Sequence, residues 1–131
     1  MRQVADPWIT LTEVATATER IRLGPMVTPL ARRRPVKVAR ETATLDRLSG
    51  GRLTLGVGLG SDRFASEYSI TGEELDDRRR ASMLDESLEI LEDFAARARF
   101  PVRIHRNPEN LGFADNFLRT ASLCRESLVA L

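Results

Sequence analysis

The stretch that decides the fold is Glu41-Thr-Ala-Thr-Leu-Asp-Arg-Leu-Ser-Gly-Gly-Arg-Leu-Thr-Leu-Gly-Val-Gly-Leu-Gly60. Its first part has helical spacing and ends in two glycines, which tolerate the positive φ found at helix C-termini. The apolar segment 53–57 predicts a strand that leads into a glycine-rich loop. Because residues 21–28 form another apolar segment before the helix, the order strand–helix–strand indicates a parallel sheet.

Ligand sites of parallel sheets lie just beyond the carboxyl ends of the strands. We therefore expect a functional site at residues 25–28 and 56–61. The pattern Gly56-x-Gly-x-Gly60 differs from the dinucleotide fingerprint, because its third glycine comes too early and residues 61–68 are a poor helix start. A Rossmann domain is thus the less favoured interpretation.

Further helices are predicted on both sides of this unit. Asp6 can cap a helix that starts with Pro7, and Pro35 opens the helix that runs to residue 48. Residues 76–77 can cap a third helix with an apolar stripe at Leu84, Leu88 and Leu91. The remaining predictions are a loop at 58–72, a strand at 102–105, a turn-rich loop at 107–112, a helix at 113–123 and a strand at 128–131.

Composition narrows the functional classes. The chain has 131 residues and a formal net charge of +1, so nothing predicts a nucleic acid or a membrane surface as partner. The one cysteine, Cys124, and the one histidine, His105, cannot form a zinc site, and no metal site is predicted. We expect His105 at the surface, Cys124 in the interior, and a soluble protein of the cytoplasm. The run 32–34 is read as solvated charge in preference to a phosphate site.

Residues 8–91 resemble the luciferase-like monooxygenase family. The matching segments include Thr18-Glu-Arg-Ile-Arg-Leu-Gly24, Ala39 to Arg52, Leu55-Gly-Val-Gly-Leu-Gly60, Glu67, Gly72, Arg79 and Leu84-Asp-Glu86. The resemblance implies an α/β protein with a (β/α)₈ barrel, which uses FMN or a deazaflavin coenzyme for hydride transfer or oxygen insertion. Because such a barrel takes about 250 residues, we expect a partial TIM-barrel fragment in the order α-β-α-β-α, without activity of its own.

The same resemblance assigns the cofactor-binding residues. Met26, Val27 and Thr28 end the first strand, where Thr28 could donate a hydroxyl to the ring edge. Gly58, Leu59, Gly60 and Ser61 follow the second strand, where the two glycines would let the backbone approach the cofactor. No catalytic residue is assigned, and the partner is a small-molecule substrate.

Residues 88–131 resemble a different family, the inverting GT-A glycosyltransferases. The match rests on the segment Phe100 to Phe117, with Asn107, Asn110, Gly112, Asp115 and Asn116 at matching places. An Asx-rich turn that caps the following helix explains the same residues. This segment is expected to form a short β-loop-α-β unit.

Two resemblances in one chain suggest a junction near Leu91. We hypothesise that residues 1–91 and 92–131 come from two enzyme fragments. A divergent small α/β domain that uses both parts is the alternative. The favoured function is that of a truncated luciferase-like flavin-dependent oxidoreductase, with a nucleotide-sugar-dependent glycosyltransferase fragment or a non-catalytic chimera as alternatives. Open strand edges would favour oligomerisation.

Overall fold

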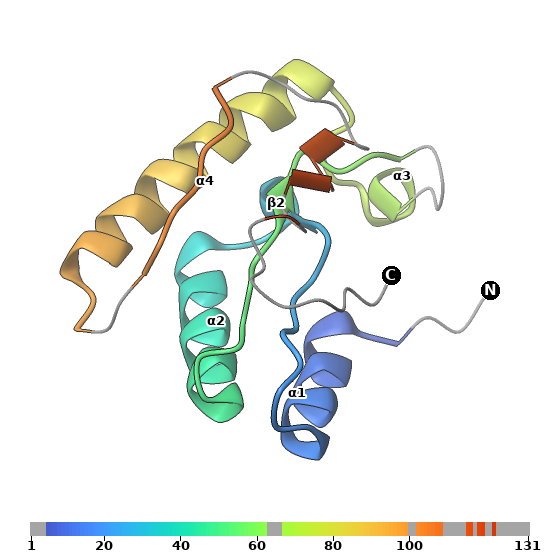
Figure 1. Cartoon of the computed structure of the whole chain (residues 1–131). Helices are drawn as coiled ribbons and strands as arrows, with labels where there is room; N and C mark the ends of the chain where they lie inside the picture. The colour runs from blue at the N-terminus through green and yellow to red at the C-terminus, as the bar shows by residue number, and fades with distance from the viewer. Residues whose placement is uncertain are drawn as a thin grey trace. The chain divides into compact units, whose positions relative to one another are not determined.

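The structure is a computed structural model that describes residues 5–62, 67–99, 102–108, 115–116, 118–119 and 122. Figure 1 shows α1 (Pro7–Ala17), β1 (Thr28–Pro29), the 3-10 helix η1 (Leu30–Arg32), α2 (Pro35–Ser49), β2 (Val57–Gly58), α3 (Glu67–Thr71) and α4 (Asp77–Arg97). The chain forms two compact units. The first unit comprises the ranges 1–26, 41–56 and 105–131, and the second unit comprises 27–40 and 57–104.

In the first unit, α1 begins as the sequence predicts. The Asp6 carboxylate accepts hydrogen bonds from the backbone N–H groups of Trp8 at 2.9 Å and Ile9 at 3.1 Å, and Pro7 occupies the first turn. One face of the helix is buried, and the resulting core comprises Trp8, Ala15, Leu23 and Leu45, with Leu11, Leu53 and Leu55 packed against it.

The first unit also contains part of the predicted strand pairing. Leu23 pairs with Leu53 in a parallel bridge, in which the N–H of Thr54 donates to the Leu23 carbonyl at 2.8 Å. Gly24 lies so close to the backbone of Thr54 that a Cβ at position 24 would overlap the Thr54 carbonyl oxygen. Glycine at position 24 therefore lets the two segments approach each other.

Arg52 connects three segments of the first unit. All five N–H donors of its guanidinium are used. The acceptors are the carbonyl oxygens of Ala15 at 2.7 Å, Thr18 at 2.8 Å, Ile21 at 2.9 Å and Ser49, together with the Thr18 hydroxyl at 3.0 Å. The carbonyl of Ala15 lies in the last turn of α1, where carbonyls lack partners within the helix.

In the second unit, β1 and β2 form a parallel pair in which Thr28 lies opposite Val57 and Pro29 opposite Gly58. The unit also contains α4, which runs as one continuous helix (Figure 1) and packs against η1. The Asp76 carboxylate accepts a hydrogen bond from the Arg79 N–H at 2.8 Å, so the predicted cap of this helix is confirmed.

The helix that connects the paired segments, α2, also follows its local signals. It starts at Pro35 and ends at Ser49, after which Gly50 and Gly51 have φ values of 68° and 84°. The N–H of Gly51 donates to the carbonyl of Asp46 at 2.9 Å, as in a glycine-terminated helix end. The parallel strand–helix–strand order is therefore confirmed, while the layout as a partial TIM-barrel fragment stays a prediction.

Two sequence predictions are wrong. The segment 58–72 is not a continuous loop, because it contains α3, whose start is capped by the Asp62 side chain. The strand predicted at 102–105 is not found, since none of these residues is part of a strand among the described residues. The described residues within 113–123 are helical, and the strand predicted at 128–131 lies outside the described residues.

Within the described ranges, we find no helix with the length and apolar character needed to cross a membrane. The division of the chain at residue 91 and oligomerisation through strand edges stay predictions.

The substitution Arg52→Lys tests the role of the guanidinium. A lysine supplies three donors on a point charge and cannot reproduce the planar fork. Because hydrogen bonds from charged groups contribute about 1.5–3 kcal/mol each, we expect a loss of about 2–4 kcal/mol, seen as a lower midpoint of urea denaturation. Arg20→Lys, at an exposed arginine, is the control and should change the midpoint little. Equal midpoints for the two variants would contradict this role.

Candidate functional site

The candidate site is built on the paired ends of β1 and β2. Because the two strands are parallel, the segments that follow Pro29 and Gly58 leave from the same carboxyl edge. Thr28 is 2% exposed, so its hydroxyl lies in the interior at the end of β1. Val27, half-buried, packs against the position where Gly58 lacks a side chain.

The two glycines of this loop have packing reasons for lacking a Cβ. A Cβ at Gly58 would lie 3.2 Å from a methyl carbon of Val27. At Gly60, where φ is 75°, a Cβ would overlap the Tyr68 hydroxyl and lie 2.8 Å from the Pro29 Cβ. The side of each glycine on which a Cβ would stand is therefore occupied by protein atoms. At these two glycines, a ligand could therefore contact backbone groups only.

The other residues predicted to bind the cofactor differ in burial. Leu59 is half-buried, and its carbonyl accepts a hydrogen bond at 3.2 Å from the Tyr68 hydroxyl, while Ser61 is exposed. Met26 is half-buried and belongs to the first unit, whereas the other predicted residues belong to the second. The assignment of Met26, Val27, Thr28 and Gly58 to Ser61 as cofactor-binding residues stays a prediction.

Tyr68 is the residue of this region that the sequence analysis missed. Its side chain is 2% exposed, and guanidinium carbons of Arg32 and Arg80 lie 4.9 Å and 4.8 Å from its ring centroid. Both distances are within the range of a cation–π interaction. An aromatic residue between Glu67 and Ser69 in a polar stretch was the available signal.

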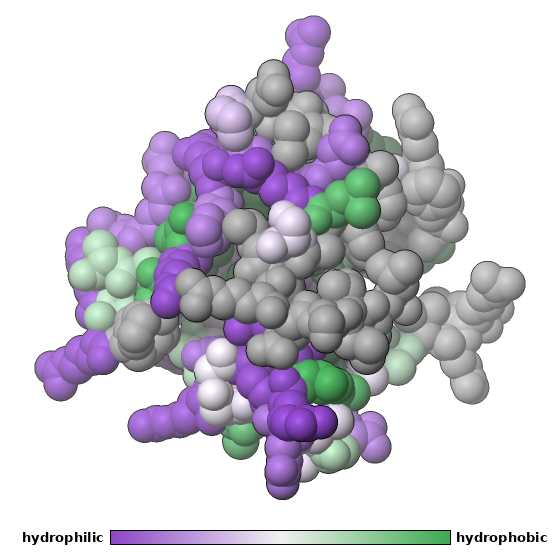
Figure 2. Space-filling view, viewed as in Figure 1, coloured by the Kyte–Doolittle hydropathy of each residue, from purple (hydrophilic) through white to green (hydrophobic). Residues whose placement is uncertain are grey.

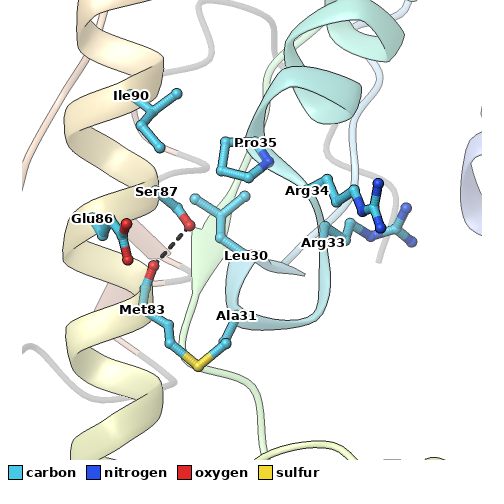
Figure 3. A pocket seen from close by; sticks show the side chains of 9 residues that line it. All are labelled: Leu30, Ala31, Arg33, Arg34, Pro35, Met83, Glu86, Ser87 and Ile90. Atoms are coloured by element: carbon cyan, nitrogen blue, oxygen red, sulfur yellow. Dashed lines mark hydrogen bonds between the residues drawn. The ribbon is translucent and has the colours of Figure 1, made fainter.

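The arginine run 32–34 is only partly solvated. Arg32 forms an ion pair with Glu73 at 2.6 Å and lies over Tyr68, so it is committed to packing. Figure 3 shows Arg33 and Arg34 pointing away from α4, whereas Leu30 and Pro35 face that helix. The solvated interpretation thus applies poorly to Arg32.

A groove lies where α4 meets the segment 30–35 (Figure 3). Its apolar lining residues are Leu30, Ala31, Pro35, Met83 and Ile90, and its polar ones are Arg33, Arg34, Glu86 and Ser87. The Ser87 hydroxyl donates to the Met83 carbonyl of its own helix at 2.7 Å.

The face in Figure 2 shows no large apolar patch among its coloured residues. On the face in Figure 2, hydrophilic side chains predominate among the coloured residues, and hydrophobic ones occur in small separate patches. Among the described residues, no group of histidine, cysteine and carboxylate side chains could hold a metal ion. His105 is exposed, as predicted, and Cys124 lies outside the described residues.

Asp62 organises the start of α3. Its carboxylate accepts hydrogen bonds from the N–H groups of Tyr68 at 2.8 Å and Ser69 at 3.2 Å. Desolvation raises the pKa of Asp62, but the hydrogen bonds from Ser69 and Tyr68 and the charge of Arg80 lower it by more, so the net pKa lies below its usual value.

Comparisons with known proteins identify the family. A family model described as luciferase-like monooxygenase matches residues 1–128. An uncharacterized protein of Mycobacterium tuberculosis is 38% identical over 88 residues, which cover 66% of this chain and 29% of the relative. The 4-hydroxyprotoasukamycin monooxygenase of Streptomyces nodosus is 39% identical over 88 residues, which cover 67% of this chain and 23% of the relative.

A solved structure agrees with these relatives. The oxygenating constituent of 3,6-diketocamphane monooxygenase from Pseudomonas putida, a type II Baeyer–Villiger monooxygenase in complex with FMN, has a TM-score of 0.61 and 26% identity. The similarity covers 78% of this chain and 27% of that protein. The chain thus spans about a quarter of the length of these relatives. It belongs to the luciferase-like monooxygenase family.

The family match also corrects the second resemblance. The matched range continues past residue 91 and includes most of 92–131, and no comparison supports a glycosyltransferase there. Asn107 and Asn116, two residues on which that resemblance rested, form a side-chain hydrogen bond of 2.7 Å with each other. The interpretation of these residues as an Asx-rich turn that caps the following helix stays a prediction.

Substitution of Gly60 by alanine tests the packing against Tyr68. The positive φ alone costs an alanine about 1 kcal/mol, and the overlap with Tyr68 and Pro29 adds to it. Gly72→Ala is a matched control, because Gly72 has a φ of 72° and no atom within 4 Å of its Cβ position. In urea denaturation, we expect Gly60→Ala to lose at least about 2 kcal/mol and Gly72→Ala about 1 kcal/mol. Equal losses would mean that the packing around Gly60 is looser than described.

The lowered pKa of Asp62 predicts a pH dependence of stability. A carboxyl group whose pKa is depressed in the folded state stabilises it above the unfolded pKa, and this contribution is lost as pH falls through the folded pKa. Asp62→Asn can still accept both hydrogen bonds but does not titrate. We expect the wild type to exceed this variant in stability by a constant amount above about pH 5, and the difference to shrink below the reference value of 3.8. Urea midpoints measured across this range check it. A difference that does not shrink at all as the pH falls below 3.8 would contradict the assignment.

Proposed function

We propose that this chain is part of a flavin-dependent oxidoreductase, and that the carboxyl ends of β1 and β2 hold the flavin ring. The observation that carries the proposal is the parallel pairing of Thr28 with Val57 and of Pro29 with Gly58. This pairing brings a buried hydroxyl and a glycine loop to one edge of the sheet, where ligands of parallel sheets bind. Family membership over residues 1–128 supports the choice of a flavin.

FMN is favoured over a deazaflavin coenzyme. The Pseudomonas putida relative, at 26% identity, was solved in complex with FMN. The residues at the site fit such a group chemically, because Thr28 has a hydroxyl that can donate or accept at a polar ring edge. The loop after β2 has backbone groups unobstructed by side chains at Gly58 and Gly60. No geometry of the complex is implied by this fit.

The reduced flavin would supply the electrons with which dioxygen is activated for insertion into a small organic substrate. The chain's own contribution is binding and the exclusion of water. Thr28, at 2% exposure, would make its hydrogen bond in a site shielded from solvent. Val27 packs on Gly58 and keeps the strand ends apolar. The proposal assigns no acid–base group to the described residues, and it assigns binding of the cofactor, not turnover, to these 131 residues.

The substitution Thr28→Val tests the site, because it removes the hydroxyl and keeps the shape of the side chain. A net hydrogen bond contributes about 0.5–1.5 kcal/mol, so we expect the Kd for FMN to rise about three- to tenfold. Quenching of FMN fluorescence measures it, with a deazaflavin coenzyme titrated in parallel. Thr16→Val, at an exposed threonine of α1, is the control and should leave the Kd unchanged.

Three outcomes bear on the proposal. Weaker FMN binding by Thr28→Val alone supports it. If the wild type binds the deazaflavin coenzyme but not FMN, the proposed cofactor is wrong and the proposed site is retained. If the wild type binds neither, the proposal fails for this chain.

A further inference from the structure

We propose that Tyr68 is a positioning residue, which holds the backbone of residues 59–61 in place through its hydroxyl group. The inference rests on the proposed function insofar as this loop is the one that would hold the flavin. The observations that carry it all lie in the second unit, and none of them involves a bound group.

Two cations contact the ring of Tyr68. Arg32, from η1, and Arg80, from the first turn of α4, place their guanidinium carbons 4.9 Å and 4.8 Å from the ring centroid. Each cation is attracted to the electron-rich face of the ring, so the two contacts restrain its position. The side chain of Tyr68 is accordingly 2% exposed.

Both arginines are themselves anchored. Arg32 is paired with Glu73 at 2.6 Å, and the N–H of Glu73 donates in turn to the Tyr68 carbonyl at 2.9 Å. Arg80 donates to the carbonyls of Glu74 at 3.1 Å and Leu75 at 2.7 Å, and it pairs with Asp77. Because other groups hold both guanidinium groups in place, the contacts with them restrain the position of the Tyr68 ring.

The hydroxyl end of this fixed ring meets the candidate loop. It donates to the Leu59 carbonyl at 3.2 Å, and Gly60 lies so close that a Cβ there would overlap the hydroxyl oxygen. The Tyr68 hydroxyl therefore restrains the backbone directly after β2 through one hydrogen bond, to Leu59, and one close contact, with Gly60. A phenylalanine would fill the same space between the arginines but would leave the Leu59 carbonyl without this donor.

The backbone of Tyr68 is also bonded to the described part of the loop. The Asp62 carboxylate accepts hydrogen bonds from the N–H groups of Tyr68 and Ser69 in α3. Tyr68 is therefore joined to residues 59–62 twice, through its backbone N–H to Asp62 and through its hydroxyl to Leu59.

The substitution Tyr68→Phe tests the inference, since it keeps the ring and both cation–π contacts and removes only the hydroxyl. Thr16→Val is the matched control, because it likewise removes one hydroxyl that donates to backbone carbonyls. The first measurement is amide hydrogen exchange of residues 59–61 in the protein without ligand. We expect faster exchange in Tyr68→Phe and no change in Thr16→Val. Unchanged exchange in Tyr68→Phe overturns the positioning role, whether or not the chain binds a flavin.

The second measurement is FMN titration of the same variants. We expect the Kd to rise about three- to tenfold in Tyr68→Phe, and the visible circular dichroism of the bound flavin at saturation to differ from the wild type. A general loss of stability would not alter the spectrum at saturation. An unchanged Kd and spectrum, beside binding by the wild type, overturn the role toward the cofactor. If the wild type binds no FMN, the proposed function has failed, and the exchange measurement alone decides whether Tyr68 positions the loop.

Discussion

The Arg52 guanidinium is the interaction on which the first unit depends. The segments that it joins have little regular pairing of their own, because the β structure found among the described residues of this unit is one parallel bridge, between Leu23 and Leu53. Arg52 supplies a cation at the end of α1, whose last turn contains no basic residue. Its remaining donors bind the carbonyls of Ile21 and Ser49, on the two segments that lead into the bridge. The Arg52 side chain thus fixes the relative positions of the backbone segments that surround the apolar core of this unit.

The sequence was sufficient where the signals are local. Asp6, Pro35, Asp76 and the pair Gly50–Gly51 mark helix ends by capping and by tolerance of positive φ, and each end lies where these signals predict it. The parallel order follows from the same information, since a helix between two apolar segments requires a crossover. By contrast, Val102 and Ile104 alternate as in a strand, but alternation does not supply a partner strand, and residues 102–105 are not part of a strand among the described residues.

The position of the candidate site follows from the topology, because ligands of parallel sheets bind after the carboxyl ends of strands, and it stays a prediction. The contacts that support the loop after β2 did not follow from the sequence. The burial of Tyr68 could not be read from its neighbours, because Arg32 and Arg80 reach it from other elements and Asp62 caps α3 from outside the helix. Such contacts depend on tertiary structure, which periodicity and capping rules do not predict. The glycosyltransferase resemblance failed for a related reason. Asparagines that cap turns occur in many folds, so a few matching positions do not identify one of them.

Glycines in a loop at a strand end can allow a ligand to approach the backbone, or they can allow other protein atoms to pack closely. The sequence alone does not distinguish these two reasons. Gly58 and Gly60 were expected to admit a cofactor, yet the volume their side chains would need is taken by Val27, Tyr68 and Pro29. The two reasons are compatible, because a loop packed tightly on its Cβ side presents its backbone groups on the other. Packing then serves binding, since a ligand that depends on backbone hydrogen bonds gains most from a loop that is already held in place. On this argument the side chains behind the loop, rather than those that line it, decide how well it binds.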